Sequence, residues 1–170
     1  MLAVYDRPDQ IEWGTLPNQF VIKTTHSSGL NIVCKDKEKL DLPSIVIKLK
    51  EWLKFNHYRE TTSREWHLKD IEPKIIIEEY LSGDPKLGLL DYKFYCYWGA
   101  PKYVKVHIDR FKQHSSKIYD LSWKQLPYHH SSFPKSSKII PKPGQLDEML
   151  CVSQKLSEGI PYCRIDLYNF

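Results

Sequence analysis

Phe20-Val-Ile-Lys-Thr-Thr-His-Ser-Ser-Gly-Leu-Asn31 is the stretch of this 170-residue chain that decides its fold. Its first half is rich in β-branched residues, which predicts a strand, and it then breaks into a polar loop that contains Gly29. Lys23 lies at the end of the predicted strand, and the backbone N–H groups of a glycine-containing loop can approach an anion closely. The pattern indicates a place that could hold phosphate groups, and a plain hairpin with Lys23 in solvent is the alternative. It is not a Walker A loop, because the lysine precedes the glycine.

The composition is that of an ordinary soluble globular chain. Hydrophobic residues make up 41% and charged residues 27%, and the net charge of +4 falls short of the dense basic stripe of a nucleic-acid-binding protein. We therefore expect no nucleic-acid partner. The apolar runs at 45–47 and 75–77 are much shorter than the about 18 residues that a membrane-spanning helix needs, so we expect no membrane span.

Cysteine usage and the first residues favour a cytoplasmic location. The four cysteines show no Cys-x-x-Cys spacing, which fits reduced and mostly buried thiols better than a disulfide framework or a zinc site. The opening Met-Leu-Ala-Val-Tyr-Asp-Arg lacks the basic and apolar regions of a signal peptide.

The spacing of the apolar residues predicts an α+β chain. Helical periodicity predicts helices at 44–55 and 146–156, with Ser44 as the N-cap of the first. The β-branched run 74–81 is typical of a strand that is buried on both faces. A Gly99-Ala-Pro101 turn is predicted to join the two strands of a second hairpin. The predicted strands are 20–23, 31–35, 74–81, 92–98, 102–109 and 162–168.

Segments rich in turn residues divide the chain. Residues 1–19 show no sustained period and are predicted to be an extended lead-in. The stretch 82–88 is the best boundary between lobes, which gives a first lobe at 20–82 and a second lobe at 83–170. The stretch 120–142, rich in Ser, Pro and His, predicts a long surface loop.

Five motifs follow one another along the chain. They are the Lys23 hairpin, Ile75-Ile-Ile-Glu-Glu-Tyr-Leu81, Asp91-Tyr-Lys-Phe94, Asp120-Leu-Ser-Trp-Lys-Gln-Leu-Pro127 and Arg164-Ile-Asp-Leu-Tyr168. In this order they resemble an ATP-grasp domain, and more narrowly the TupA-like branch, which is named for teichuronopeptide biosynthesis and found among bacterial cell-surface polysaccharide genes. The resemblance extends over nearly the whole chain. It implies an α+β, ATP-grasp-like fold of two small lobes with antiparallel sheets and a nucleotide cleft between them.

The resemblance also implies ATP and Mg²⁺ as ligands and assigns residues to the nucleotide. Lys23 would pair with the α- or β-phosphate, and Lys93 would be a second phosphate lysine. A loop of four residues would cover the phosphates, and a second set of four would bind the adenine edge and the ribose. The loop is His26, Ser27, Ser28 and Gly29, and the second set is Glu78, Glu79, Tyr80 and Leu81. Of the two glutamates, only one can face the nucleotide, because successive strand residues point to opposite sides.

Arg164 and Asp166 are two residues apart on one predicted strand, so they share a face. By resemblance, Arg164 would act in catalysis on a phosphate or acyl phosphate, and Asp166 would bind Mg²⁺. A plain salt bridge between them is nearly as good an interpretation. The family's next metal-binding strand and its N-terminal substrate lobe are expected to be missing from this sequence, so we expect nucleotide binding more readily than turnover.

The resemblance implies a carboxylate–amine ligase of surface-polysaccharide biosynthesis, with a carboxylate or polysaccharide acceptor as partner. Two alternatives remain at this stage. The chain could be a glycosyltransferase in which Asp91 or Asp109 binds a metal and a UDP-sugar, or a non-catalytic protein that binds a nucleotide or a partner. Other residues have ordinary interpretations: the histidines 107, 114, 129 and 130 as polar surface, and the tyrosines of 92–103 as core and rim rather than a surface for single strands.

Overall fold

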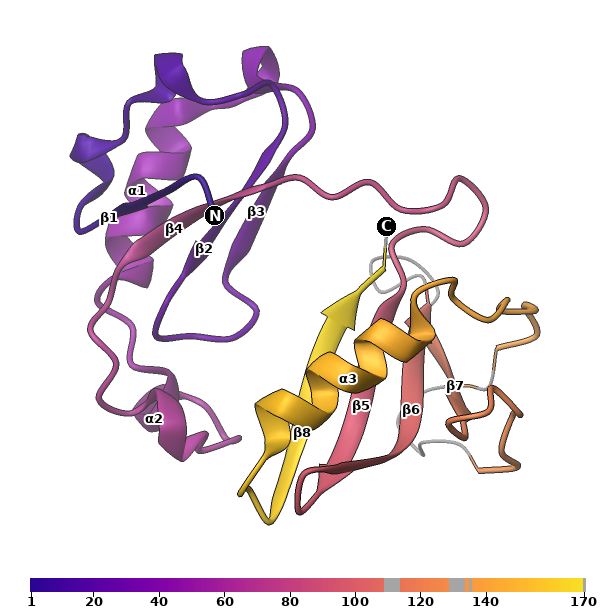
Figure 1. The fold of residues 1–170 in the computed structure, drawn as a ribbon. Coiled ribbons are helices and arrows are strands. Elements are labelled where there is room, and N and C mark those ends of the chain that lie inside the picture. The colour runs from indigo at the N-terminus through magenta and orange to yellow at the C-terminus, as the bar shows by residue number, and fades with distance from the viewer. Residues whose placement is uncertain (109–113, 129–133, 135, 170) are drawn as a thin grey trace. The chain divides into compact units, whose positions relative to one another are not determined.

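Figure 1 shows the computed structural model of the chain, which describes residues 1–108, 114–128, 134 and 136–169. Contacts within the chain group into two compact units, Met1–Tyr80 and Leu81–Phe170. Each unit contains one four-stranded antiparallel sheet and at least one helix. The α+β class predicted from the sequence is therefore confirmed.

The sheet of the first unit has the strand order β1-β4-β2-β3. Its strands are β1 (Ala3–Tyr5), β2 (Phe20–Thr24), β3 (Asn31–Cys34) and β4 (Ile75–Glu79). The stretch before Phe20 is thus more than a lead-in, because β1 pairs with β4 and extends the sheet. The helices are α1 (Leu42–Trp52) and the short α2 (His57–Glu60), with single 3-10 turns η1 (Pro8–Gln10), η2 (Trp13–Thr15), η3 (Lys37–Lys39) and η4 (Trp66–Leu68).

Alternation along the strands of the first unit gives the sheet one buried face and one more exposed face of mixed apolar and charged residues. Phe20 and Ile22 of β2 and Ile75 and Ile77 of β4 are fully buried in one apolar cluster with Leu49 of α1. The residues between them on β4 are half-buried or exposed. The prediction that 74–81 is buried on both faces is therefore wrong, because an antiparallel sheet needs cover on only one side.

Helix α1 begins earlier than the sequence predicted. Its N-cap is Asp41, whose Oδ1 accepts a hydrogen bond from the Ser44 backbone N–H at 3.2 Å, so Ser44 lies inside the first turn. The Ser44 hydroxyl also donates to Asp41 Oδ2 at 2.5 Å, and these two hydrogen bonds lower the pKa of the Asp41 carboxyl. Pro43 fits here because the first turn of a helix does not need its N–H group.

The sheet of the second unit has the strand order β7-β6-β5-β8. Its strands are β5 (Asp91–Tyr97), β6 (Ala100–Ile108), β7 (Ser115–Tyr119) and β8 (Tyr162–Tyr168). Helix α3 (Leu146–Ser157) crosses one face and contacts β8, β5 and β6 (Figure 1). Its residues Leu146 and Met149 pack with Phe94 and Val104 in a second apolar core.

Two details of the second sheet differ from the prediction. The β5–β6 turn is Trp98-Gly99, both with positive φ (50° and 76°), and Ala100 and Pro101 already belong to β6. Two successive residues with positive φ make the tight turn that matches the twist of a hairpin. The strand β7 was not predicted at all, because its Ser-Ser-Lys start lacks an apolar alternation.

Candidate functional site

Lys23 and Glu78 form an ion pair on the more exposed face of the first sheet. In the register of β2 and β4, Lys23 lies opposite Ile76 and Val21 lies opposite Glu78, so both charged side chains share that face. Lys23 Nζ contacts Glu78 Oε2, with the side chains 43% and 37% exposed. A pair this exposed contributes about 1 kcal/mol or less, so a ligand phosphate could replace the carboxylate as the partner of Lys23 at small cost.

The register also separates the two glutamates of β4. Glu79 lies opposite Phe20, whose side chain is in the apolar core, so Glu79 belongs to the other face and is exposed at the strand end. Of the two residues, Glu78 is the one on the same face as Lys23. Tyr80 and Leu81 follow β4 and are half-buried.

The loop after β2 is held by the histidine at the start of α2. Ser27 Oγ lies 2.9 Å from His57 Nδ1, and Ser28 Oγ lies 3.3 Å from His57 Nε2. Glu65 Oε1 accepts from Ser28 Oγ at 3.4 Å and lies 3.4 Å from His57 Nε2. His57 is 7% exposed, so a nearly buried imidazole fixes both serine hydroxyls.

His26 has a different place from the serines that follow it. Its ring is 3% exposed, and its Nε2 lies 3.0 Å from the backbone oxygen of Trp52. It therefore anchors the base of the loop to the end of α1. Gly29 has φ of +82°, a conformation that side-chain-bearing residues rarely adopt.

A second group of charges lies on the sheet of the second unit, on the face opposite α3. Lys93 lies opposite Asp166 in the β5–β8 register. Its Nζ is 3.0 Å from Asp91 Oδ2 and also contacts Asp166 Oδ2. Arg164 donates to both oxygens of Asp166, from Nε at 2.7 Å and from Nη2 at 2.9 Å. The salt-bridge interpretation of Arg164 and Asp166 therefore describes their geometry.

Their surroundings perturb the titration of these groups. Burial alone raises the pKa of the Asp166 carboxyl, but the hydrogen bonds from Arg164 and Lys93 outweigh it and hold that pKa below its usual value. The same hydrogen bond to Asp166 raises the pKa of Arg164. Burial lowers the pKa of the neighbouring Lys105, and the charges of Arg164 and Lys93 lower it further. This face therefore holds several cations at close range.

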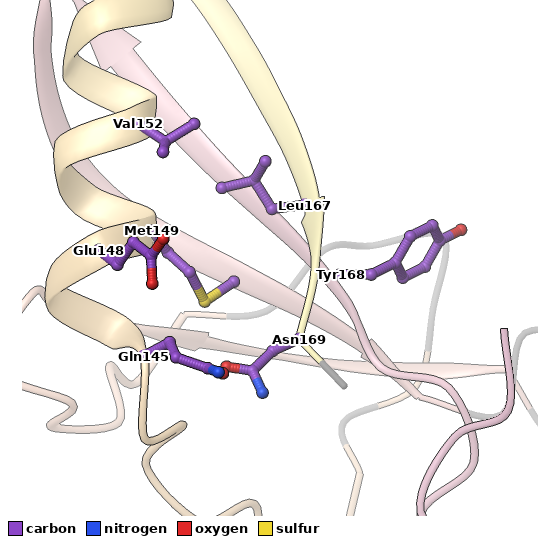
Figure 2. Close-up of a pocket in the computed structure, with 7 residues that line it drawn as sticks. All are labelled: Gln145, Glu148, Met149, Val152, Leu167, Tyr168 and Asn169. Carbon is purple, nitrogen blue, oxygen red and sulfur yellow. The ribbon is translucent and has the colours of Figure 1, made fainter. Parts of the chain in front are cut away.

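A hollow of about 250 Å³ lies between the start of α3 and the end of β8 (Figure 2). Figure 2 shows Leu167 and Met149 on its inner side and Tyr168 turned to the other side of the strand. None of the residues assigned to a ligand from the sequence lines it. Its lining residues are Gln145, Glu148, Met149, Val152, Leu167, Tyr168 and Asn169.

Comparison with known families matches residues 1–170 to the family model described as "TupA-like ATPgrasp". The chain belongs to the TupA-like ATP-grasp family. No curated protein and no solved structure matched the chain. Its two sheets are accordingly those of α+β, ATP-grasp-like lobes. Among the helices of the described residues, none has the length and apolarity to cross a bilayer.

The charged face of the second ATP-grasp-like lobe fits Mg²⁺ only together with a nucleotide. Mg²⁺ is usually held by one or two carboxylates plus substrate phosphates, and Asp166 provides one such carboxylate. Its two oxygens accept hydrogen bonds from Arg164 and Lys93, so both cations would have to give way in part. Within the described part of the chain, no three His, Cys, Asp or Glu side chains gather as a metal site without a nucleotide.

Sequence reasoning missed His57 and Glu65, which no motif marks and which come 29 to 37 positions after the serines that they contact. Asp91 was noted beside Lys93 and given a ligand only in the glycosyltransferase alternative, and its contact with Lys93 places it in the charged group. His107 Nδ1 and His114 Nε2 lie 2.6 Å apart. Asp109, His129 and His130, also considered from the sequence, lie outside the described residues.

Proposed function

We propose that this chain binds ATP as its magnesium complex and that its chemistry is that of a carboxylate–amine ligase. The observation that carries the proposal is the arrangement on the first sheet. Lys23 lies on the more exposed face beside Glu78, near the end of a strand that leads into a loop with a positive-φ glycine. The chain matches the TupA-like ATP-grasp family throughout.

In this proposal Lys23 pairs with the α- or β-phosphate, and the backbone N–H groups of the loop 26–29 cover the phosphates. Glu78, released from Lys23, accepts from a ribose hydroxyl. The backbone of the segment 78–81, which includes Glu79, Tyr80 and Leu81, binds the adenine edge. The fixed hydroxyls of Ser27 and Ser28 keep the loop in one conformation, which lowers the entropy lost on binding.

The second lobe supplies cations and one carboxylate. Lys93 is the second phosphate lysine, and Arg164 stabilises negative charge that develops on the transferred phosphoryl group. Asp166 holds Mg²⁺, which would neutralise phosphate charge when bound. We place the two lobes at 20–82 and 83–170, with 1–19 added to the first.

The reaction class follows from ATP-grasp chemistry. A carboxylate oxygen of the acceptor attacks the γ-phosphorus, the bond to the β-phosphate oxygen breaks, and ADP leaves. An amine then attacks the acyl phosphate and expels phosphate. We propose that the acceptor belongs to a bacterial cell-surface polysaccharide pathway of the teichuronopeptide type and that the protein acts in the cytoplasm.

The test is calorimetric titration of the chain with ATP and Mg²⁺, with UDP-glucose as the competing ligand class. Lys23→Ala should weaken ATP binding about tenfold or more, because a hydrogen bond to a charged group contributes about 1.5–3 kcal/mol. Lys50→Ala, at an exposed position of α1, is the matched control and should leave the affinity unchanged. Unchanged affinity in Lys23→Ala, or binding of UDP-glucose in place of ATP, would overturn the proposal.

A second candidate, nucleotide binding without turnover, is favoured by one observation. Both Asp166 oxygens are engaged by Arg164, and one also by Lys93, which competes with metal binding. Release of ADP that depends on an added carboxylate acceptor separates the candidates. ADP release supports the ligase, and intact ATP with measurable binding supports the binding protein.

A further inference from the structure

The hydroxyl of Ser27 and the imidazole of His57 are placed as a nucleophile and a base. The loop between β2 and β3 lies beside α2 in the first unit (Figure 1), and Ser27 Oγ is 2.9 Å from His57 Nδ1. Another acceptor of this hydroxyl, the backbone oxygen of Ser28, is farther away at 3.4 Å. A serine hydroxyl in hydrogen-bond contact with an imidazole that a third group orients is the arrangement that activates serine as a nucleophile.

The groups on the other side of the ring determine which nitrogen carries the proton. Glu65 Oε1 lies 3.4 Å from His57 Nε2, and an ionised carboxylate can only accept hydrogen bonds. The Ser63 hydroxyl lies 3.3 Å from the same nitrogen. An uncharged imidazole has one N–H group, and its place is set by the partners that the two nitrogens face. With the proton on Nε2, Nδ1 keeps its lone pair and accepts the proton of Ser27.

Ser28 lacks this arrangement, although it belongs to the same loop. Its Oγ lies 3.3 Å from Nε2, the nitrogen that carries the proton, and it donates its own hydrogen to Glu65 Oε1 at 3.4 Å. Ser28 is also exposed, whereas Ser27 is half-buried and His57 is nearly buried, so water competes less for the contact between Ser27 and the base. Of the serines around this ring, Ser27 is therefore the one that faces the lone pair.

We propose that Ser27 is a phosphorylation site of this chain, with the γ-phosphoryl group of its own bound ATP as the donor and His57 as the general base. The inference rests on the function proposed above, because bound ATP supplies the phosphoryl group. Ser27 belongs to the loop whose N–H groups are proposed to cover the phosphates. Such donors stabilise the negative charge of a phosphoryl group, so the site favours an anionic electrophile over a neutral ester.

The step is an in-line displacement at phosphorus. Ser27 Oγ attacks the γ-phosphorus, a new O–P bond forms, and the bond between the γ-phosphorus and its bridging oxygen breaks. The bridging oxygen keeps the electron pair and leaves as part of ADP. The hydroxyl proton of Ser27 passes to His57 Nδ1, and the Glu65 carboxylate beside Nε2 stabilises the imidazolium that forms. The products are ADP and a chain phosphorylated on Ser27.

The test is incubation of the full chain with Mg²⁺ and ATP labelled at the γ-phosphate, followed by peptide mapping of the label. Acetyl phosphate is a second phosphoryl donor that needs no nucleotide site, and nitrophenyl acetate tests acyl transfer. We expect ATP to label Ser27 and to leave Ser27→Ala unlabelled. Label on Ser28 instead, or equal label in Ser27→Ala, would overturn the proposal. Acetylation of Ser27 without phosphorylation by either donor would show an acyl-transfer site and would overturn it as well.

Variants of His57 test its role as the base. His57→Gln should slow labelling at saturating ATP at least about a hundredfold, because general-base catalysis contributes about 10²–10⁴ in rate. Added imidazole should restore labelling in His57→Ala but not in Ser27→Ala, which distinguishes a base from a residue that only holds the loop. Thr62→Ala removes an exposed hydroxyl next to Ser63 and, as the matched control, should react as the parent chain does. An unchanged rate in His57→Gln, or a loss in Thr62→Ala as large as in Ser27→Ala, would contradict the assignment.

Glu65 is a positioning residue, because it acts through His57. Glu65→Gln should slow labelling at saturating ATP about tenfold or more, since the removed charge no longer stabilises the imidazolium. The ATP concentration that gives half of the maximal rate should stay within about threefold of that of the parent chain, because the glutamine keeps the size of the side chain. A rise in that concentration at an unchanged maximal rate would show that Glu65 only holds the loop.

Calorimetric titration with a non-hydrolysable ATP analogue separates failure of this inference from failure of the proposed function. Binding of the analogue without labelling of Ser27 by ATP overturns the inference and leaves the nucleotide-binding proposal intact. Absence of binding overturns the proposed function and, with it, ATP as the donor. In that case, label on Ser27 from acetyl phosphate still supports the activated serine, and no label from either donor overturns the nucleophile too.

Discussion

Replacing Lys93 by alanine should destabilise the second unit far more than replacing Lys23 destabilises the first. Both lysines pair with a carboxylate on a sheet face, but their solvent exposure differs. The side chains of Lys93 and Asp91 are 9% and 3% exposed, whereas those of Lys23 and Glu78 are 43% and 37% exposed. Water screens the first pair poorly and the second pair well.

The magnitudes follow from this difference. Removing one partner of a buried ion pair costs about 3–5 kcal/mol, because the remaining charge stays in a poorly solvated place. An exposed pair contributes about 0.2–1 kcal/mol. Lys93→Ala should therefore lower the free energy of unfolding of its unit by about 3 kcal/mol or more, and Lys23→Ala by no more than about 1 kcal/mol. For a unit of this size, about 1 kcal/mol corresponds to a shift of about 4–8 °C in melting temperature.

Urea unfolding followed by circular dichroism measures both changes. If Lys93→Ala does not fold, Lys93→Met keeps most of the buried stem and removes only the charge. Combined with Asp91→Asn it completes a double-mutant cycle, and a direct ion pair predicts a coupling free energy of about 1 kcal/mol or more. Equal losses in Lys93→Ala and Lys23→Ala, or an additive cycle, would refute the reasoning from burial.

Three further predictions test other parts of the structure. Gly29→Ala should cost about 1 kcal/mol of loop stability through backbone strain alone, since nothing lies within 4 Å of the added Cβ, and calorimetry should show severalfold weaker ATP binding; unchanged affinity would show that the loop does not contact phosphate. Because the pKa of Asp166 is lower in the folded state than its usual value of 3.8, the ionised carboxylate stabilises the fold above pH 3.8, and this contribution is lost as the pH falls through the lower folded pKa. Asp166→Asn should therefore flatten the acid side of a curve of stability against pH. A curve parallel to that of the parent chain would contradict this. The exposed Cys151 should react first with a thiol reagent, while the buried Cys34 and Cys96, whose thiol pKa values burial raises, should react only on unfolding; equal rates in peptide mapping would argue against these burials.

The regular elements could be predicted from the sequence because their physical signal is local. The alternation Phe20-Val-Ile-Lys23 puts every second residue in the core, and the helix 146–157 shows the same agreement between period and burial. The start of α1 was misplaced because both Asp41 and Ser44 are good N-caps, and only the preference of Pro43 for a first turn distinguishes them. The strand β7 was not predicted because its pairing with β6, not its own composition, makes it a strand.

The candidate site was less predictable because its contacts join distant parts of the chain. The lysine and the glycine loop could be found from their spacing, but the histidine that holds Ser27 and Ser28 comes from another element and follows no repeat. Likewise, Arg164 and Asp166 could be placed on one face from their spacing. Their contact with Lys93 depends on the β5–β8 register, which the separate strands do not reveal.

The register of β2 against β4 links the sequence of the first unit to its proposed chemistry. A shift of one residue would move Lys23 to the α1 side and bring Phe20 and Ile22 to the more exposed face. Each of these apolar side chains gains about 1.5–3 kcal/mol from burial, so together they oppose the shift much more strongly than the exposed Lys23–Glu78 pair could. The position of Lys23, the lysine proposed to bind phosphate, is therefore set by its apolar neighbours rather than by its ion pair with Glu78.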